Sequence, residues 1–204
     1  MKRSNGLSQM KKKLNKGIKN MRNYVIIHGS FGNSQEHYLP WLKKQLEKEG
    51  GEVVCLDFPI GVGKQCYKNW ETKLNEYKNK INKDTIFIGR SIGPIFAIKY
   101  IMENNLKINK LIAVSGFNNY SVDGGDYDKV NESMFVDNLN KFKQHCNEVV
   151  CVISENDPYV KLHALKDFAQ QLAVKIINIK DGGHFNADSG YGEKFEQLLE
   201  LANE

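Results

Sequence analysis

The sequence predicts an α/β protein built on a compact, mostly parallel sheet of about six strands with helices on both faces. Short apolar runs alternate with helical patterns from residue 24 onward, which is typical of a doubly wound sheet. Most of these runs are continuously apolar, as expected for parallel strands that are covered on both faces. The predicted strands are Tyr24–His28, Glu52–Asp57, Thr85–Gly89, Lys110–Ser115, Val149–Glu155 and Val174–Ile179.

Apolar residues between these runs recur at helical spacing, which predicts amphipathic helices packed on the sheet. Ile95–Ile101 differs because it is apolar almost all round, so we expect a helix buried against the centre of the sheet. The longest gap between strands, residues 116–148, contains Gly124-Gly125 and is expected to form a small excursion over the functional site. The amphipathic stripes are Leu39, Leu42 and Leu46; Leu162, Leu165, Ala169 and Leu172; and Phe195, Leu198, Leu199 and Ala202.

The positive charge of the chain is concentrated at its N-terminal end. Residues 1–22 contain eight Lys and Arg and no acidic residue, which leaves 21 basic and 24 acidic residues in the remainder. The net charge of +5 therefore hides a mildly acidic body, which does not indicate a specific nucleic-acid site. We expect residues 1–22 to be a disordered basic extension and residues 23–204 to form one domain. Attraction of the extension to anionic surfaces and a translation start at Met21 are the alternatives.

Several classes of protein lack their signatures here. No run of about 18 apolar residues occurs, so no membrane span is expected. Four scattered cysteines without CxxC spacing indicate reduced thiols and a cytoplasmic protein. No P-loop sequence is present, and the first turn after a strand lacks the dinucleotide-binding glycines. Because His, Cys and carboxylate residues do not cluster at metal-ligand spacing, neither a metal nor a cofactor is expected.

The pentapeptide Gly89-Arg90-Ser91-Ile92-Gly93 joins a strand-like run to a helix-like run. A G-x-S-x-G sequence at such a junction forms a tight elbow, in which small flanking residues leave room for the turn. The elbow lifts the serine hydroxyl above the sheet edge, beside a helix N-terminus. Ser91 is therefore the candidate nucleophile.

Two further residues follow later strands, at the edge where parallel sheets bind their ligands. Pro158 holds Asp157 extended past the fifth strand, where a carboxylate can orient an imidazole. His184 follows the last strand in a loop with two glycines, which can carry its ring over the sheet edge. Serine needs such partners because its hydroxyl is a weak nucleophile; a histidine accepts the proton and an aspartate fixes the tautomer. The chain order of serine, aspartate and histidine is that of α/β-hydrolases.

The loop that follows the first strand, His28–Gly32, supplies the rest of the expected site. The backbone N–H groups of Ser30 and Phe31 are expected to meet that of Ile92 and form an oxyanion hole. An apolar acyl pocket is expected to contain Phe31, Phe117 and Phe185. No catalytic role is assigned to the other histidines, which are His28, His37, His145 and His163.

Four sequence elements together resemble the small serine hydrolases related to retinoblastoma-binding protein nine. They are Tyr24–Ser30, the elbow, Asn156–Val160 and Gly182–Asn186, within a similarity that spans about residues 23–203. The resemblance implies an α/β-hydrolase fold without a large cap domain, and hydrolase activity on poorly defined natural substrates. It also carries the family's nucleophile, acid and base onto Ser91, Asp157 and His184.

The sequence departs from this family pattern at two places. Histidine often precedes the nucleophile in the family, but Arg90 occupies that position here. We expect this arginine to bond a neighbouring loop carbonyl, and selection of an anionic substrate by its charge is the alternative. The family name also suggests pocket-protein binding through Leu-x-Cys-x-Glu, but the nearest match, Gln144–Glu148, lacks the leucine, so that partner is not expected.

These residues predict a carboxylesterase-like serine hydrolase that cleaves a small ester, thioester or amide through an acyl-enzyme on Ser91. Without a large cap the pocket should be shallow, so short acyl groups should be preferred. The alternative is a non-catalytic binding module on a hydrolase scaffold, because a fold does not by itself determine a function.

Overall fold

The computed structural model describes residues 22–119 and 126–204. The expected basic extension, apart from Arg22, and the Gly124-Gly125 pair lie outside the described residues. The expectations for these two segments therefore stay predictions.

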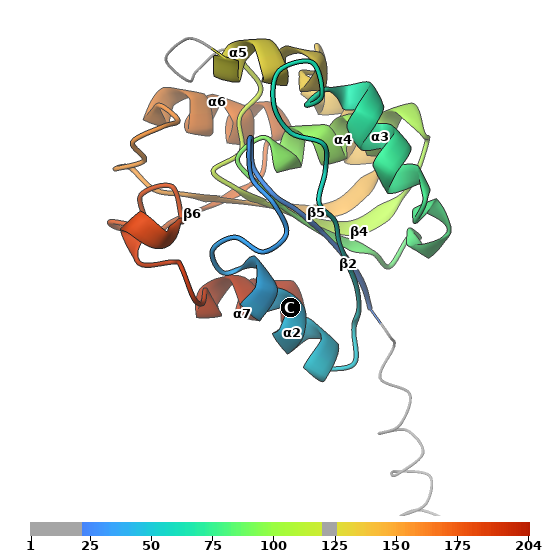
Figure 1. Cartoon of the computed structure of the whole chain (residues 1–204), viewed down its shortest axis with the longest axis horizontal. Helices are drawn as coiled ribbons and strands as arrows, with labels where there is room; N and C mark the ends of the chain where they lie inside the picture. The colour runs from blue at the N-terminus through green and yellow to red at the C-terminus, as the bar shows by residue number, and fades with distance from the viewer. Residues whose placement is uncertain (1–21, 120–125) are drawn as a thin grey trace, which may run out of the picture.

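All six strands of the sheet are parallel, in the order β2-β1-β3-β4-β5-β6 (Figure 1). This arrangement confirms the predicted fold class, and each predicted strand overlaps an observed one. The main difference is β5, which begins earlier than expected. The strands are β1 (Asn23–Ile27), β2 (Glu52–Cys55), β3 (Ile86–Arg90), β4 (Ile108–Val114), β5 (Cys146–Ile153) and β6 (Lys175–Asn178).

Helices cover both faces of the sheet, as Figure 1 shows. One face carries α2 (Leu39–Lys48) and α7 (Glu196–Asn203), and the other carries α3 (Tyr67–Asn75), α4 (Gly93–Glu103) and α6 (Leu162–Leu172). The helix α3 was not among the helices predicted from the sequence, because its buried stripe is mostly aromatic and lies among Lys and Asn residues. Shorter elements are α5 (Asp126–Asn131), η1 (Lys78–Lys80), η2 (Glu132–Met134), η3 (Leu139–Gln144) and η4 (Ala187–Ser189).

Two apolar layers sandwich the sheet because successive strand residues point to opposite faces. Phe87 packs in the layer of α3, α4 and α6, whereas its neighbours Ile86 and Ile88 pack in the layer of α2 and α7. Helix α4 is buried from Gly93 to Ile98 and again at Tyr100 and Ile101, as its mostly apolar sequence predicts. This burial fixes the N-terminus of α4 beside the end of β3, where the elbow lies.

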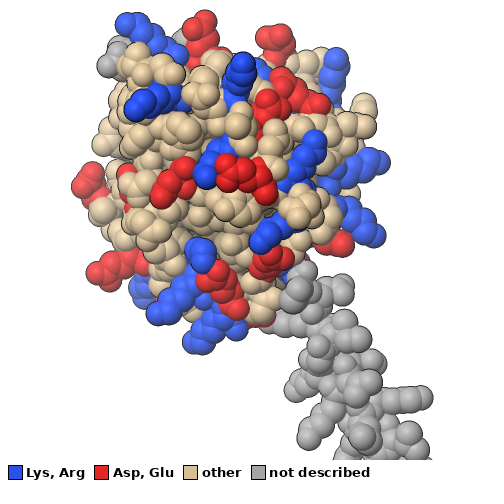
Figure 2. Space-filling view, turned by 45° about the vertical axis from the view of Figure 1, so that its right-hand side comes forward, with Lys and Arg blue, Asp and Glu red and all other residues tan. Residues whose placement is uncertain are grey.

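The surface drawn in Figure 2 carries Lys and Arg interspersed with Asp and Glu, without a large patch of one sign. None of the described helices combines the length and the apolar character that a membrane crossing requires. The four cysteines are free thiols, and burial raises the pKa of three of them (Cys55, Cys146 and Cys151) to about 12.

Candidate active site

Ser91 lies in the predicted tight turn between β3 and α4. Its φ of 58° is in the left-handed region, which an L-residue adopts only when its surroundings hold it there. A Cβ on Gly89 would come within 2.5 Å of Pro94 N, and one on Gly93 within 2.8 Å of the Ile27 carbonyl oxygen. Both flanking glycines of the motif are therefore required by close packing of the backbone.

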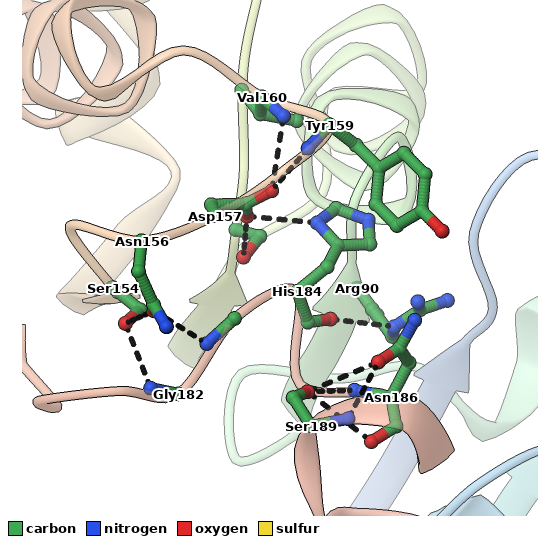
Figure 3. Close-up of polar contacts among 12 residues, drawn as sticks. Arg90, Ser154, Asn156, Asp157, Tyr159, Val160, Gly182, His184, Asn186 and Ser189 are labelled. Carbon is green, nitrogen blue, oxygen red and sulfur yellow. Dashed lines mark hydrogen bonds and ion pairs between the residues drawn. The ribbon is translucent and has the colours of Figure 1, made fainter.

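Asp157 and His184 form a buried hydrogen-bonded pair, at the centre of Figure 3. The distance from His184 Nδ1 to Asp157 Oδ2 is 2.8 Å, and the two side chains are 7% and 1% exposed. Because a carboxylate only accepts hydrogen bonds, the imidazole proton lies on Nδ1, which leaves Nε2 as the acceptor nitrogen. The backbone N–H groups of Tyr159 and Val160 donate to Asp157 Oδ1 at 2.9 and 3.0 Å.

Burial and charge set the protonation states of this pair. Burial lowers the pKa of His184, the nearby charge of Arg90 lowers it further, and Asp157 opposes both effects. Burial alone would raise the pKa of Asp157, but the hydrogen bond and charge of His184, with the two backbone N–H groups, outweigh it. The pKa of Asp157 is therefore lowered, so near neutral pH the pair consists of an ionised carboxylate and a neutral imidazole.

Ser115 is a further partner of this pair that the sequence did not reveal. It follows β4, is fully buried, and donates a hydrogen bond of 2.8 Å from its Oγ to Asp157 Oδ2. The oxygen that holds His184 thus accepts two hydrogen bonds. A serine directly after a strand, at the same sheet edge as the other site residues, was the available signal.

The loops that carry Asp157 and His184 are fastened to each other. Gly182 N donates to Ser154 Oγ at 2.9 Å, and Gly183 N donates to Asn156 Oδ1 at 2.8 Å (Figure 3). Gly183 has a φ of 54°, and a Cβ on Gly182 would lie 2.5 Å from the ring of Phe185. The two glycines therefore allow this loop to pack tightly around His184.

The expected oxyanion donors do not behave alike. The N–H groups of Ser30 and Ile92 form no hydrogen bond with another described residue. The Phe31 N–H instead donates to Gln65 Oε1 at 2.9 Å, so this donor is already occupied. Gln65 Nε2 and Ser30 Oγ in turn both donate to Asn131 Oδ1, at 2.9 and 2.8 Å. The structure thus leaves Ser30 and Ile92 as the available pair.

Ser91 and His184 line the same cavity, which has a volume of about 150 Å³. The hydroxyl of Ser91 forms no hydrogen bond with a described residue, His184 included, although both side chains line this cavity. In unliganded enzymes the hydrogen bond between nucleophile and base is often long and tightens when substrate binds. The remaining lining residues are Ser30, Glu36, His37, Arg90, Phe117, Tyr127, Asn131, Tyr159, Val160 and Asn186.

The expected aromatic pocket is partly wrong. Phe117 lines the cavity as predicted, but Phe31 and Phe185 do not. Phe31 packs edge-on against Tyr127, with ring centroids 5.0 Å apart. Phe185 has a left-handed φ of 48° and is fully buried in the layer of α2 and α7, stacked on Phe195. Its place next to His184 in the sequence suggested the pocket, but the turn directs its ring into the core.

Two histidines outside the pair differ in their surroundings. His28 is buried, with Nδ1 bonded to the Gly29 carbonyl and Nε2 accepting from Phe58 N, so both ring nitrogens serve the fold. His37 lines the cavity, although no role was assigned to it. Burial, helped by the charge of Arg90, lowers the pKa of His37 to about 4, which keeps this ring neutral. In the part of the chain that the structure describes, no three or more His, Cys, Asp or Glu residues are placed to hold a metal ion.

Known proteins share both the sequence pattern and the fold. Residues 24–203 match the serine hydrolase family. YdeN of Bacillus subtilis (strain 168), a protein described by its name as a hydrolase, is 26% identical over 168 residues, which are 81% of this chain and 87% of YdeN. The crystal structure of the ydeN gene product superposes with a TM-score of 0.78 at 23% identity and covers 89% of this chain and 97% of its own.

Two further structures show the same architecture at lower identity. The esterase EaEST from Exiguobacterium antarcticum has a TM-score of 0.66 at 13% identity, covering 89% of this chain and 90% of its own. Est1E from Butyrivibrio proteoclasticus has a TM-score of 0.63 at 19% identity, covering 88% and 86%. These neighbours establish an α/β-hydrolase fold without a large cap. Because the family match spans residues 24–203, the chain belongs to the serine hydrolase family.

Proposed function

We propose that the domain of residues 23–204 is a carboxylesterase-like enzyme that cleaves a small ester, thioester or amide through an acyl-enzyme on Ser91. The observation that carries this proposal is the 2.8 Å hydrogen bond between buried Asp157 and neutral His184, whose side chain lines the same cavity as Ser91. A neutral imidazole held in one tautomer by an ionised carboxylate is the arrangement that activates a serine hydroxyl.

The first half of the reaction forms the acyl-enzyme. Ser91 Oγ attacks the acyl carbonyl carbon while His184 Nε2 accepts the hydroxyl proton. Asp157 keeps the proton on Nδ1 and stabilises the imidazolium that forms. The N–H groups of Ser30 and Ile92 then donate to the carbonyl oxygen as it becomes negative, and each such donor contributes about 2.7–4 kcal/mol. Collapse of the intermediate breaks the bond to the leaving group, which takes the proton from Nε2.

The second half releases the acid. A water molecule gives its proton to His184 Nε2 and attacks the acyl carbon, and Ser91 Oγ leaves with that proton. The size of the cavity supports a short acyl group, because a cavity of about 150 Å³ holds a benzene-sized molecule. Phe117 supplies an apolar contact in this space.

Labelling of the purified protein with a fluorophosphonate tests the proposal. The expected result is labelling of the wild type, with complete loss in Ser91→Ala and His184→Ala. Ser133→Ala, which removes a serine outside the cavity, should label like the wild type. A substrate screen would follow with acetyl, butyryl and long-chain esters.

Two results would contradict the proposal. Labelling that persists in Ser91→Ala would place the reactive serine elsewhere. A folded wild-type protein that neither reacts with the probe nor turns over short esters would favour the alternative hypothesis of a non-catalytic binding module. Circular dichroism of each variant separates loss of activity from loss of fold.

A further inference from the structure

Arg90 is a buried cation in the wall of the cavity, and no carboxylate of residues 22–119 or 126–204 pairs with it. The residue is 7% exposed and lines the same cavity as Ser91. Its side chain forms one hydrogen bond to another described residue, from Nε to the His184 carbonyl oxygen at 3.3 Å (Figure 3). The two terminal nitrogens of the guanidinium, with four N–H donors, form no bond within the described residues.

An unpaired guanidinium in such a place is unfavourable unless an anion meets it. Arginine side chains in proteins stay charged at all physiological pH values, which makes the burial of an arginine without a partner costly. Buried charges in proteins are normally paired. The charge of Arg90 also reaches the cavity, because it adds to burial in lowering the pKa of His37 and of His184.

Glu36 is the carboxylate that lines the same cavity as Arg90. Its Oε1 accepts from Asn33 Nδ2 at 3.3 Å, and its Oε2 lies 3.7 Å from His37 Nε2, so its contacts lie elsewhere. Burial raises the pKa of Glu36, and the charge of Arg90 opposes that rise without an ion pair between them. Glu36 and Arg90 therefore line one cavity as separate charges.

We propose that the substrate carries a carboxylate and that Arg90 binds it, an inference that rests on the proposed hydrolase function. Arginine suits this task because its planar fork of donors matches the two oxygens of a carboxylate. Arg90 directly precedes Ser91 and shares its small cavity, so the carboxylate lies a few bonds from the carbonyl that Ser91 attacks. It belongs either to the acyl group or to the leaving group.

Two matched pairs of esters test the inference and distinguish these two placements. Monoethyl succinate and ethyl butyrate differ in a charge on the acyl side, whereas 4-acetoxybenzoate and methyl 4-acetoxybenzoate differ in a charge on the leaving group. We expect wild type to favour the anionic member of one pair by about tenfold or more in kcat/KM, the usual effect of a charged hydrogen bond.

Substitutions of Arg90 and of the oppositely charged Glu36 then test whether the preference comes from Arg90. In Arg90→Gln the ratio of anionic to neutral kcat/KM should fall about tenfold, and Arg90→Lys should retain part of it. In Glu36→Gln the ratio should rise, because a competing negative charge is removed. The ratio compares two substrates of one protein, so a general loss of active enzyme does not change it.

Each possible result decides a different point. Turnover with no preference for the anionic member of either pair would overturn the inference and leave the proposed function intact. A preference that Arg90→Gln leaves unchanged would also overturn it. Absence of turnover of all four esters, together with absent fluorophosphonate labelling, would overturn the proposed function and this inference with it. If Arg90→Gln fails to fold, the wild-type ratios and the Glu36→Gln variant still decide.

Discussion

Two groups of residues line or adjoin the cavity, and different features of the chain hold them in place. The residues that we propose for catalysis, called the catalytic set, are Ser91, Asp157 and His184, and they follow the ends of β3, β5 and β6 in turns fixed by glycine or proline. The loop set (Glu36, His37, Tyr127 and Asn131) lines the cavity from the β1–α2 connection and from α5. The catalytic set thus depends on short local motifs, whereas the loop set depends on how distant segments pack. The class of reaction can therefore be read from this sequence more readily than the substrate.

Asp157→Asn would give the largest effect within the catalytic set. An amide at this position can donate to Nδ1, which would hold His184 in the wrong tautomer while keeping the shape of the site. We expect kcat to fall by about 10³–10⁴, with much less change in KM. Steady-state kinetics on a short ester measure this. A fall of only a few-fold would mean that Asp157 does not set the tautomer, and the catalytic set would then lack its third member.

The sequence predicted the proposed catalytic set because each member has a local cause. The glycines at positions 89 and 93 are required by backbone contacts below 3 Å, and any sequence that builds this turn must contain them. The parallel strands were predictable for a similar reason, since burial on both faces requires continuous apolar runs. These features need only neighbouring residues, so a single sequence shows them.

The loop set and the supporting hydrogen bonds have no such local signal. Asn131 Oδ1 accepts hydrogen bonds from Ser30 and Gln65, and these three residues lie in three separate segments of the chain. No spacing rule connects them. For Phe185 the sequence instead predicted a contact that the structure does not have. Its place next to His184 suggested the pocket, but its left-handed backbone turns the ring into the core. Neighbourhood in the sequence was a poor guide to the direction of a side chain.

Ser115 shares a property with each group. It contacts the catalytic set through Asp157, but only the structure revealed it. In Ser115→Ala, Asp157 Oδ2 would lose one of its two hydrogen bonds. We expect kcat/KM to fall about tenfold, as for the loss of one hydrogen bond to a charged group. Because the hydroxyl stabilises the ionised carboxylate, the pKa of Asp157 should rise at the same time.

A pH profile of kcat/KM separates this positioning role from a merely structural one. Without the hydroxyl, the carboxylate would interact more strongly with protonated His184, so the acid limb of the profile should move to higher pH. A variant with unchanged limb and lower thermal stability would show that Ser115 supports the fold alone.

The smallest effect that we expect is a shift in the acid limb of the pH profile of kcat/KM when Arg90 is changed. His184 must be neutral to accept a proton, so kcat/KM falls as pH drops through the pKa of this residue. Burial and Arg90 lower that pKa, so the limb should lie below the ordinary histidine value of 6.5. Arg90→Gln removes one of the two lowering influences, and the limb should therefore move to higher pH. Glu103→Gln, a charge change outside the cavity, serves as the control and should leave the limb in place. If Arg90→Gln moves the acid limb to lower pH or leaves it in place, the charge of Arg90 does not lower the pKa of His184. Arg90 could then bind the substrate without influencing the proposed base.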